Sequence, residues 1–294
     1  TDFCNANNSF LIDFTFEYSY SHLGLFSSVW ARPSPEHLAE RMKEVYFLSN
    51  DQILSKVEAA KESISKYTWK HVAEKNVDLV NNLSNVFVGQ PTKIGWVSTW
   101  GIRCGIATYS EHLLSHISED FVIFAQRQNK DTEANLVRCW NVGDDQLEEL
   151  FHNIVNNSIT TIVVQFNYGF FNFDAFSKFI RKIKKNKIKI IVFLHSTIDP
   201  QSDSTKKIKD LSVALSLCDR ICVHSTSDLN RLKKIRLVEN VTLFPHGILN
   251  FDKHISKQHL PKKSKKEFIF SSYGFCLPNK GFSELIQAID LLIN

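Results

Sequence analysis

Between residues 94 and 245, short apolar runs alternate with stretches of helical periodicity, and this alternation limits the fold more than any other feature. The apolar runs are Ile94–Ser98, Phe121–Ala125, Leu136–Trp140, Thr161–Asn167, Ile188–His195, Arg220–His224 and Val241–Pro245. The helical stretches lie at 106–114, 144–157, 172–185, 204–217 and 226–235. Strands that alternate with helices are typical of a parallel sheet with helices on its faces. The sequence therefore predicts an α/β domain with a Rossmann-like, doubly wound parallel sheet.

The first predicted strand of this region leads through a glycine-bearing loop into a helix. The strand ends at Ser98, and the loop contains Gly101 and Gly105. Unpaired backbone N–H groups and the positive end of the helix dipole make such a helix N-terminus a seat for phosphate. The spacing Gly101-x-x-x-Gly105 is neither the dinucleotide fingerprint nor a P-loop. Taken alone, the two glycines are equally consistent with ordinary turn residues.

Composition excludes several classes of protein. With 294 residues, 43% hydrophobic and 22% charged, the chain is typical of a soluble globular protein and long enough for two domains. The net charge of +4 is too small to indicate nucleic acid as a partner. The six cysteines lack CxxC spacing and predict reduced thiols in a cytoplasmic protein without a metal site. No apolar run approaches the ~20 residues that a membrane span needs.

The sequence before the sheet region is predicted to be mostly helical. Ser34 and Pro35 are typical of an N-cap and a first helical residue, and Leu38, Met42 and Val45 are predicted to form the buried stripe of that helix. The chain lacks an initiator methionine, and its last helix has no cap at the C-terminus. We therefore expect the chain to be a piece of a longer polypeptide.

Changes in composition predict the domain boundaries. A mostly helical segment covers 1–85, a linker 86–92, the Rossmann-like domain 93–250, a second linker 251–266, and the start of another Rossmann-like domain 267–294. The linkers are polar and contain Gly89 and Pro91 in the first case and a lysine-rich run in the second.

Six short motifs occur in the order in which glycosyltransferases of the GT-B fold, family 4 type, carry them. They are WGIRCGIATYS at 100–110, VQFNYG at 164–169, FLH at 193–195, VHS at 223–225, FPHG at 244–247 and GFCLPNKG at 274–281. The sequence resembles that family over 93–294. Residues 1–85 resemble the closing segment of another such domain, so the chain would span the junction of two tandem domains. An unrelated helical extension is the alternative for this segment.

The resemblance implies an activity. The intact enzyme would transfer a hexose from a nucleotide diphosphate sugar to a glycan or glycolipid acceptor, with retention and with neither cofactor nor metal. Phe275 stands where family members often carry arginine, which weakens the expected donor site. The family's paired glutamates would lie outside this chain, so the piece alone is expected to be inactive. Two alternatives are a catalytically silent sugar- or nucleotide-binding domain and a nicotinamide oxidoreductase, which the loop spacing disfavours.

The resemblance also assigns roles to residues. The expected catalytic residues are His195 and Lys280, the expected diphosphate or loop residues are Gly101, Arg103, Gly105 and Gly281, and the expected acceptor or cleft residues are Asn167, Tyr168 and His246. A lysine and helix N–H groups can stabilise a departing diphosphate. A histidine at the carboxyl end of a strand lies where α/β sheets bind ligands and can contact a sugar hydroxyl. Solvated cations, a structural histidine and core aromatics are the alternatives.

The run from Lys178 to Lys189 places seven cations around three apolar residues. A basic amphipathic helix can lie on an anionic membrane surface, which predicts a peripheral contact at the inner face of a membrane. A solvated helix face, whose cations favour the C-terminal end of the dipole, is the alternative.

Overall fold

The structure of the protein is a computed structural model. It describes residues 4–19, 29–65, 92–128, 134–201, 203, 205–247 and 282–293. The chain divides into two compact units, Thr1–His246 and Gly247–Asn294. The described part of the second unit is helix α9 (Phe282–Ile293). The predicted linkers, the predicted strand at 268–273 and the expected donor residues Lys280 and Gly281 lie outside the described residues, so these expectations stay predictions.

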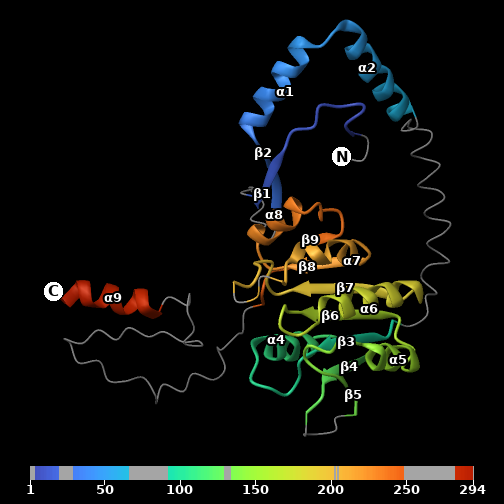
Figure 1. Ribbon diagram of the computed structural model, residues 1–294, viewed down its shortest axis with the longest axis vertical. Coiled ribbons are helices and arrows are strands. Elements are labelled where there is room, and N and C mark those ends of the chain that lie inside the picture. The colour runs from blue at the N-terminus through green and yellow to red at the C-terminus, as the bar shows by residue number, and fades with distance from the viewer. Residues whose placement is uncertain are drawn as a thin grey trace. The chain divides into compact units, whose positions relative to one another are not determined.

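Parallel strands form a seven-stranded sheet in the first unit (Figure 1). They are β3 (Ile94–Ser98), β4 (Phe121–Gln126), β5 (Leu136–Trp140), β6 (Thr161–Phe166), β7 (Lys189–Leu194), β8 (Arg220–Val223) and β9 (Val241–Leu243). Their order across the sheet is β5-β4-β3-β6-β7-β8-β9. The prediction of a Rossmann-like parallel sheet is therefore confirmed. The order reverses between β3 and β6, the point at which α/β sheets bind ligands outside the carboxyl ends of their strands.

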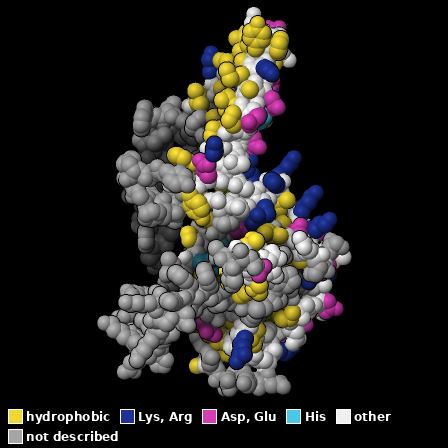
Figure 2. Space-filling model, turned by 90° about the vertical axis from the view of Figure 1, so that its left-hand side faces the viewer, with side chains coloured by type: hydrophobic (Ala, Val, Ile, Leu, Met, Phe, Trp, Pro, Cys, Tyr) yellow, Lys and Arg dark blue, Asp and Glu magenta, His cyan; other side chains and the backbone are white. Residues whose placement is uncertain are grey.

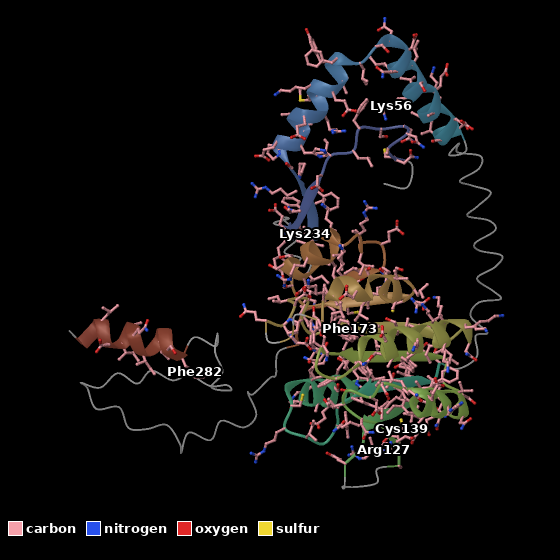
Figure 3. The ribbon with its side chains drawn as sticks, viewed as in Figure 1. Lys56, Arg127, Cys139, Phe173, Lys234 and Phe282 are labelled. Atoms are coloured by element: carbon pink, nitrogen blue, oxygen red, sulfur yellow. The ribbon has the colours of Figure 1, made fainter. Side chains whose placement is uncertain are left out.

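Helices cover the two faces of the sheet unequally in the part of the chain that the structure describes. The helices of this region are α4 (Gly105–Leu114), α5 (Glu148–Asn156), α6 (Phe173–Lys185), α7 (Ser212–Ser216) and α8 (Thr226–Lys234), with a 3₁₀ turn at Ile208–Leu211. The larger core packs one face against α5 to α8, and a smaller core packs the other face against α4. Phe173, at the start of α6, lies against Phe166 of β6 within the larger core (Figure 3).

Alternation along the strands decides which residues reach each core. In β7, Ile190, Val192 and Leu194 belong to the larger core, whereas Ile191 and Phe193 belong to the smaller one. Successive side chains of a strand point to opposite faces of a sheet. The residue that follows this strand, at position 195, therefore continues the face that α4 covers.

Close packing around position 95 in β3 leaves no room for a side chain larger than that of glycine. A Cβ added at Gly95 would lie 2.9 Å from Cε2 of Phe124 and 3.0 Å from Cγ2 of Ile159. Both neighbours are buried in the larger core and have little room to move. A glycine at this position thus allows β3 to approach the larger core closely.

The N-terminal segment contains a hairpin and two helices within its described residues. Strands β1 (Phe14–Tyr18) and β2 (Val29–Pro33) pair antiparallel, and α1 (Pro35–Phe47) and α2 (Asn50–Ser65) follow. The side chain of Ser34 accepts a hydrogen bond from the backbone N–H of His37, so Ser34 is the N-cap, as predicted. The hairpin is held at α8, where Asn230 Oδ1 accepts from Phe16 N at 2.7 Å and Asn230 Nδ2 donates to Phe16 O at 2.9 Å.

The predicted buried stripe of α1 is wrong. Leu38 is 39% exposed, Met42 65% and Val45 39%, and Figure 2 shows hydrophobic side chains exposed among charged ones at the helical end of the molecule. Periodicity identifies the apolar side of a helix, but burial also needs an element to pack against it. Among the described residues, no side chain of α1 or α2 is buried.

Candidate functional site

The loop between β3 and α4 is held in place by the neighbouring strand β4. Gln126 at the end of β4 accepts a hydrogen bond from Trp100 N at 3.0 Å and donates one to Trp100 O at 3.3 Å. Gly101 has a φ of +68°, and a Cβ there would lie 3.1 Å from Nε2 of Gln128. The backbone conformation and the close approach both favour glycine at this position.

In the described part of the chain, no side chain caps the backbone N–H groups at the start of α4. The N-cap residue Cys104 makes no side-chain hydrogen bond to the helix, and the first turn contains no acidic residue. A Cβ added at Gly105 would meet nothing within 4 Å, so the space over this helix end is open. Arg103 is exposed beside it. The structure thus brings Gly101, Arg103 and Gly105 together in one loop, where free N–H groups and a cation favour an anion.

Three histidines meet at the carboxyl ends of β7, β8 and β9. His224 lies between the other two: its ring centroid is 5.1 Å from that of His195 and 3.9 Å from that of His246, on which it stacks. Tyr109 of α4 packs against all three, with centroid distances of 5.1, 5.6 and 5.4 Å to His195, His224 and His246. We call these four residues the histidine cluster. Two of its members, His195 and His246, are candidates from the sequence.

Hydrogen bonds define the protonation of two of these imidazoles. His195 Nε2 lies 2.7 Å from Oε1 of Gln165 on β6, and His224 Nδ1 lies 2.8 Å from the backbone oxygen of Phe244. Both oxygens accept, so each of these nitrogens carries the hydrogen. Burial, together with the nearby His224 and His246, lowers the pKa of His195 to about 3, and burial also lowers the pKa of His224. Both imidazoles are therefore neutral near pH 7.

Several polar atoms of this region are buried without a hydrogen-bond partner among the described residues. They are Nε2 of Gln165, Nε2 of His224 and the hydroxyl of Tyr109. Buried polar groups in proteins are normally paired, so each of these atoms retains unused hydrogen-bonding capacity beside the histidine cluster. An imidazole nitrogen with a lone pair accepts from a hydroxyl, and an amide N–H donates to one. The cluster is suited to a neutral group with several hydroxyls.

A buried carboxylate joins the loops that follow β7 and β8. Asp228 accepts hydrogen bonds from Thr197 Oγ1 at 2.6 Å, from Arg231 Nη2 at 2.7 Å and from the hydroxyl of Ser225. Arg231 Nε also donates to Thr197 Oγ1 at 2.7 Å. Because Thr197 lies two residues after His195 and Ser225 directly follows His224, this network links the two loops that begin at these histidines.

Two other predicted site residues, Asn167 and Tyr168, make contacts within their own part of the fold. Asn167 Oδ1 accepts a hydrogen bond from Gly169 N at 2.9 Å, which closes a turn after β6. Tyr168 is 7% exposed within the larger core, and its hydroxyl donates to Asp199 Oδ1 at 3.0 Å. The histidine cluster lies on the other face of the sheet, so the side chain of Tyr168 is not part of it.

The described residues contain neither a metal-binding group nor a membrane-spanning helix. No group of three or more His, Cys, Asp or Glu residues could hold a metal ion among them. In the same part of the chain, no helix is both long and apolar enough to cross a membrane.

No family model matches the chain, and no curated protein matches it. Among solved structures, the chain is similar to the crystal structure of Anabaena HepE in complex with UDP and glucose, at 12% sequence identity and a TM-score of 0.33. The match covers 53% of this chain and 45% of the HepE chain, which is less than half of that protein. A likeness at this TM-score carries no argument about function.

Proposed function

We propose that the chain contains the acceptor-side domain of a glycosyltransferase of the GT-B fold, family 4 type. The enzyme would transfer a hexose from a nucleotide diphosphate sugar to a glycan or glycolipid acceptor. The observation that carries this proposal is the pairing of two features at the carboxyl edge of one sheet. The open N-terminus of α4 suits a diphosphate, and the neutral imidazoles of His195 and His224 suit sugar hydroxyls. The six motifs of the sequence add support.

The chemistry assigns different tasks to the two features. Breaking the bond between sugar and diphosphate leaves negative charge on the departing diphosphate. The N–H groups at Gly105 and the Arg103 cation can stabilise that charge, with Lys280 and Gly281 as the predicted groups of the donor domain. His195 would bind a hydroxyl of the sugar. We further propose that transfer proceeds with retention, without a metal ion, in the cytoplasm, and that residues 1–85 close a preceding glycosyltransferase domain.

Gly105→Pro tests the diphosphate part of this proposal. Proline is tolerated at the first position of a helix, and Cys104 before it has the extended backbone (φ −145°, ψ 131°) that a following proline requires. The substitution removes one N–H group and leaves the helix in place. We expect UDP to bind about 10- to 100-fold more weakly, because a hydrogen bond to a charged group contributes about 1.5–3 kcal/mol. Titration calorimetry measures this affinity.

Gly105→Ala is the matched control. It keeps the N–H group, and its Cβ enters open space, so UDP affinity should not change. Equal affinities of the Pro and Ala variants, or no binding of any nucleoside diphosphate by the unmodified protein, would contradict the diphosphate site.

Phe275 favours a second candidate function, a sugar- or nucleotide-binding domain that lacks catalysis. It occupies the position at which family members often carry arginine beside the donor diphosphate. Transfer of a labelled hexose by the full-length polypeptide separates the candidates. Nucleotide binding without any transfer would favour the binding domain.

We also propose that α6 contacts an anionic membrane surface through its cations. The apolar side of α6 packs in the larger core, where Phe176, Phe179 and Ile183 are at most 2% exposed. The contact would therefore be electrostatic, without insertion. Lys182 pairs with Glu148 and Lys184 with Asp219, whereas the structure shows no ion pair for the exposed Lys178 and Lys185 within the described part of the chain.

The double variant Lys178→Gln, Lys185→Gln tests this contact. Each lysine near an anionic surface contributes about 1 kcal/mol, so partitioning onto phosphatidylserine-containing vesicles should fall about 30-fold. Vesicle sedimentation measures it at low salt. Lys43→Gln, Lys61→Gln on α1 and α2 is the control pair and should leave partitioning unchanged. No vesicle binding by the unmodified protein would leave α6 as a solvated helix face.

A further inference from the structure

The side chain of Gln165 lies against the imidazole ring of His195. Gln165 is the penultimate residue of β6, is 0% exposed, and pairs in register with Phe193 of β7. Alternation therefore places its side chain on the same face as Phe193 and His195. Its Oε1 atom lies 2.7 Å from Nε2 of His195.

This contact sets the tautomer of His195. A side-chain amide oxygen has only lone pairs to offer, so Nε2 of His195 must carry the hydrogen of the contact. A neutral imidazole has one N–H, which leaves Nδ1 with the lone pair. The structure shows no hydrogen bond to Nδ1 of His195 among the residues it describes. This nitrogen is therefore available as an acceptor.

His224 has the opposite tautomer. Its Nδ1 donates to the backbone oxygen of Phe244, so its Nε2 has the lone pair and is buried without a partner among the described residues. The two neighbouring rings thus each offer one accepting nitrogen. The groups that surround His195 are Tyr109 on α4, Gln165 on β6, His224 after β8 and His246 after β9. None of these carries a negative charge that would draw a second proton onto the ring.

We propose that Gln165 is a positioning residue that holds His195 as the Nε2–H tautomer, so that Nδ1 accepts a hydrogen bond from a hydroxyl group of the ligand. The identity of the ligand as a sugar rests on the proposed function, whereas the tautomer does not. A phosphate oxygen without a hydrogen cannot donate to Nδ1. This arrangement therefore selects a hydroxyl group over an anion at His195 and separates the roles of the histidine cluster and the α4 N-terminus.

Nitrogen NMR of the ¹⁵N-histidine-labelled protein measures the tautomer directly, because protonated and unprotonated ring nitrogens have well-separated shifts. We expect the Nε2–H form of His195 near pH 7 in the unmodified protein. Gln165→Met keeps the length of the side chain but removes the acceptor, and should give a mixture of tautomers. Gln165→Glu restores an acceptor, should restore the Nε2–H form, and should raise the pKa of His195 by roughly 1–3 units.

The signal of His224 serves as the internal control. Its Nδ1–H form depends on Phe244 and should persist in both variants if the fold is intact. The Nδ1–H form of His195 in the unmodified protein would overturn the proposal without the use of any variant. A Gln165→Met protein that keeps a pure Nε2–H form would overturn it as well. Because no readout involves transfer, a full-length polypeptide that transfers no hexose would contradict the proposed transferase activity and leave the tautomer proposal standing.

Discussion

Asp228→Ala is expected to lower the free energy of unfolding by about 3 kcal/mol, the lower end of the range observed when one partner of a buried ion pair is removed, because the Arg231 side chain is 35% exposed. Asp228 is 8% exposed and accepts hydrogen bonds from Thr197, Ser225 and Arg231. The substitution would leave the Arg231 cation without its carboxylate and two hydroxyls without their acceptor. Urea denaturation, followed by circular dichroism, measures the change.

Asp145→Ala is the matched control. Asp145 is exposed, so its substitution should change the free energy of unfolding by less than about 0.5 kcal/mol. A loss below 1 kcal/mol for Asp228→Ala, which is the size of one ordinary hydrogen bond, would contradict the structural role given to the network.

The pH dependence of the Asp228 network has a definite sign. Burial alone would raise the pKa of Asp228, but the hydrogen bonds from Ser225, Thr197 and Arg231 outweigh it and hold the pKa below its ordinary value of 3.8. The ionised form is therefore favoured in the folded state. Its stabilisation is present above pH 3.8 and is lost as the pH falls through the lower folded-state pKa.

The sheet could be predicted because its strands are short, apolar and separated by helical periods. Helix α6 ends at Lys185, as predicted, and β5 has its predicted bounds. The predicted strands at 161–167, 188–195 and 220–224 extend one residue too far at the carboxyl end. Those extra residues are Asn167, His195 and His224, which leave the strand pairing and provide side chains for turns or for the cluster. Hydrophobic patterning cannot separate a strand from the residue that follows it.

The site could be predicted only in part. A position at a strand end places His195 at the carboxyl edge, and a glycine loop places Gly105 at a helix start. Tyr109 and Gln165 were missed because their roles depend on neighbours from other elements, which periodicity does not reveal. Alternation along β6 and β7 offered one signal, since it puts Gln165 on the same face as His195.

The main error concerns burial. The periodicity predicts a buried stripe on α1, but α1 has no buried side chain. For Tyr168 the sequence leaves core packing as the alternative to a place at the acceptor or cleft, and its ring packs against Phe166 and Phe173 in the larger core, with centroid distances of 5.9 and 6.0 Å. Both cases depend on which elements pack together, and periodicity alone does not reveal that.

Mild acid is expected to destabilise the protein through the histidine cluster. The folded-state pKa of His195 is about 3, well below its ordinary value of 6.5. Below pH 6.5 the His195 imidazole therefore binds a proton in the unfolded chain but stays neutral in the folded protein. The free energy of unfolding is thus highest above pH 6.5 and falls as the pH decreases toward 3. Below about pH 6 the slope approaches about 1.4 kcal/mol per pH unit, which amounts to about 2 kcal/mol between pH 7 and 5. The lowered pKa of His224 acts in the same direction.

Urea titrations at pH 7 and pH 5 measure this loss. His195→Gln removes the titrating group, so its free energy of unfolding should fall about 2 kcal/mol less over this interval than that of the unmodified protein. The neighbours that face His195 are Tyr109, Gln165, His224 and His246, and no carboxylate among them can offset the uptake of a proton. His152→Gln, at an exposed position on α5, should keep the full acid sensitivity. If His195→Gln were as acid-sensitive as the unmodified protein, the neutral, buried state assigned to this imidazole would be wrong.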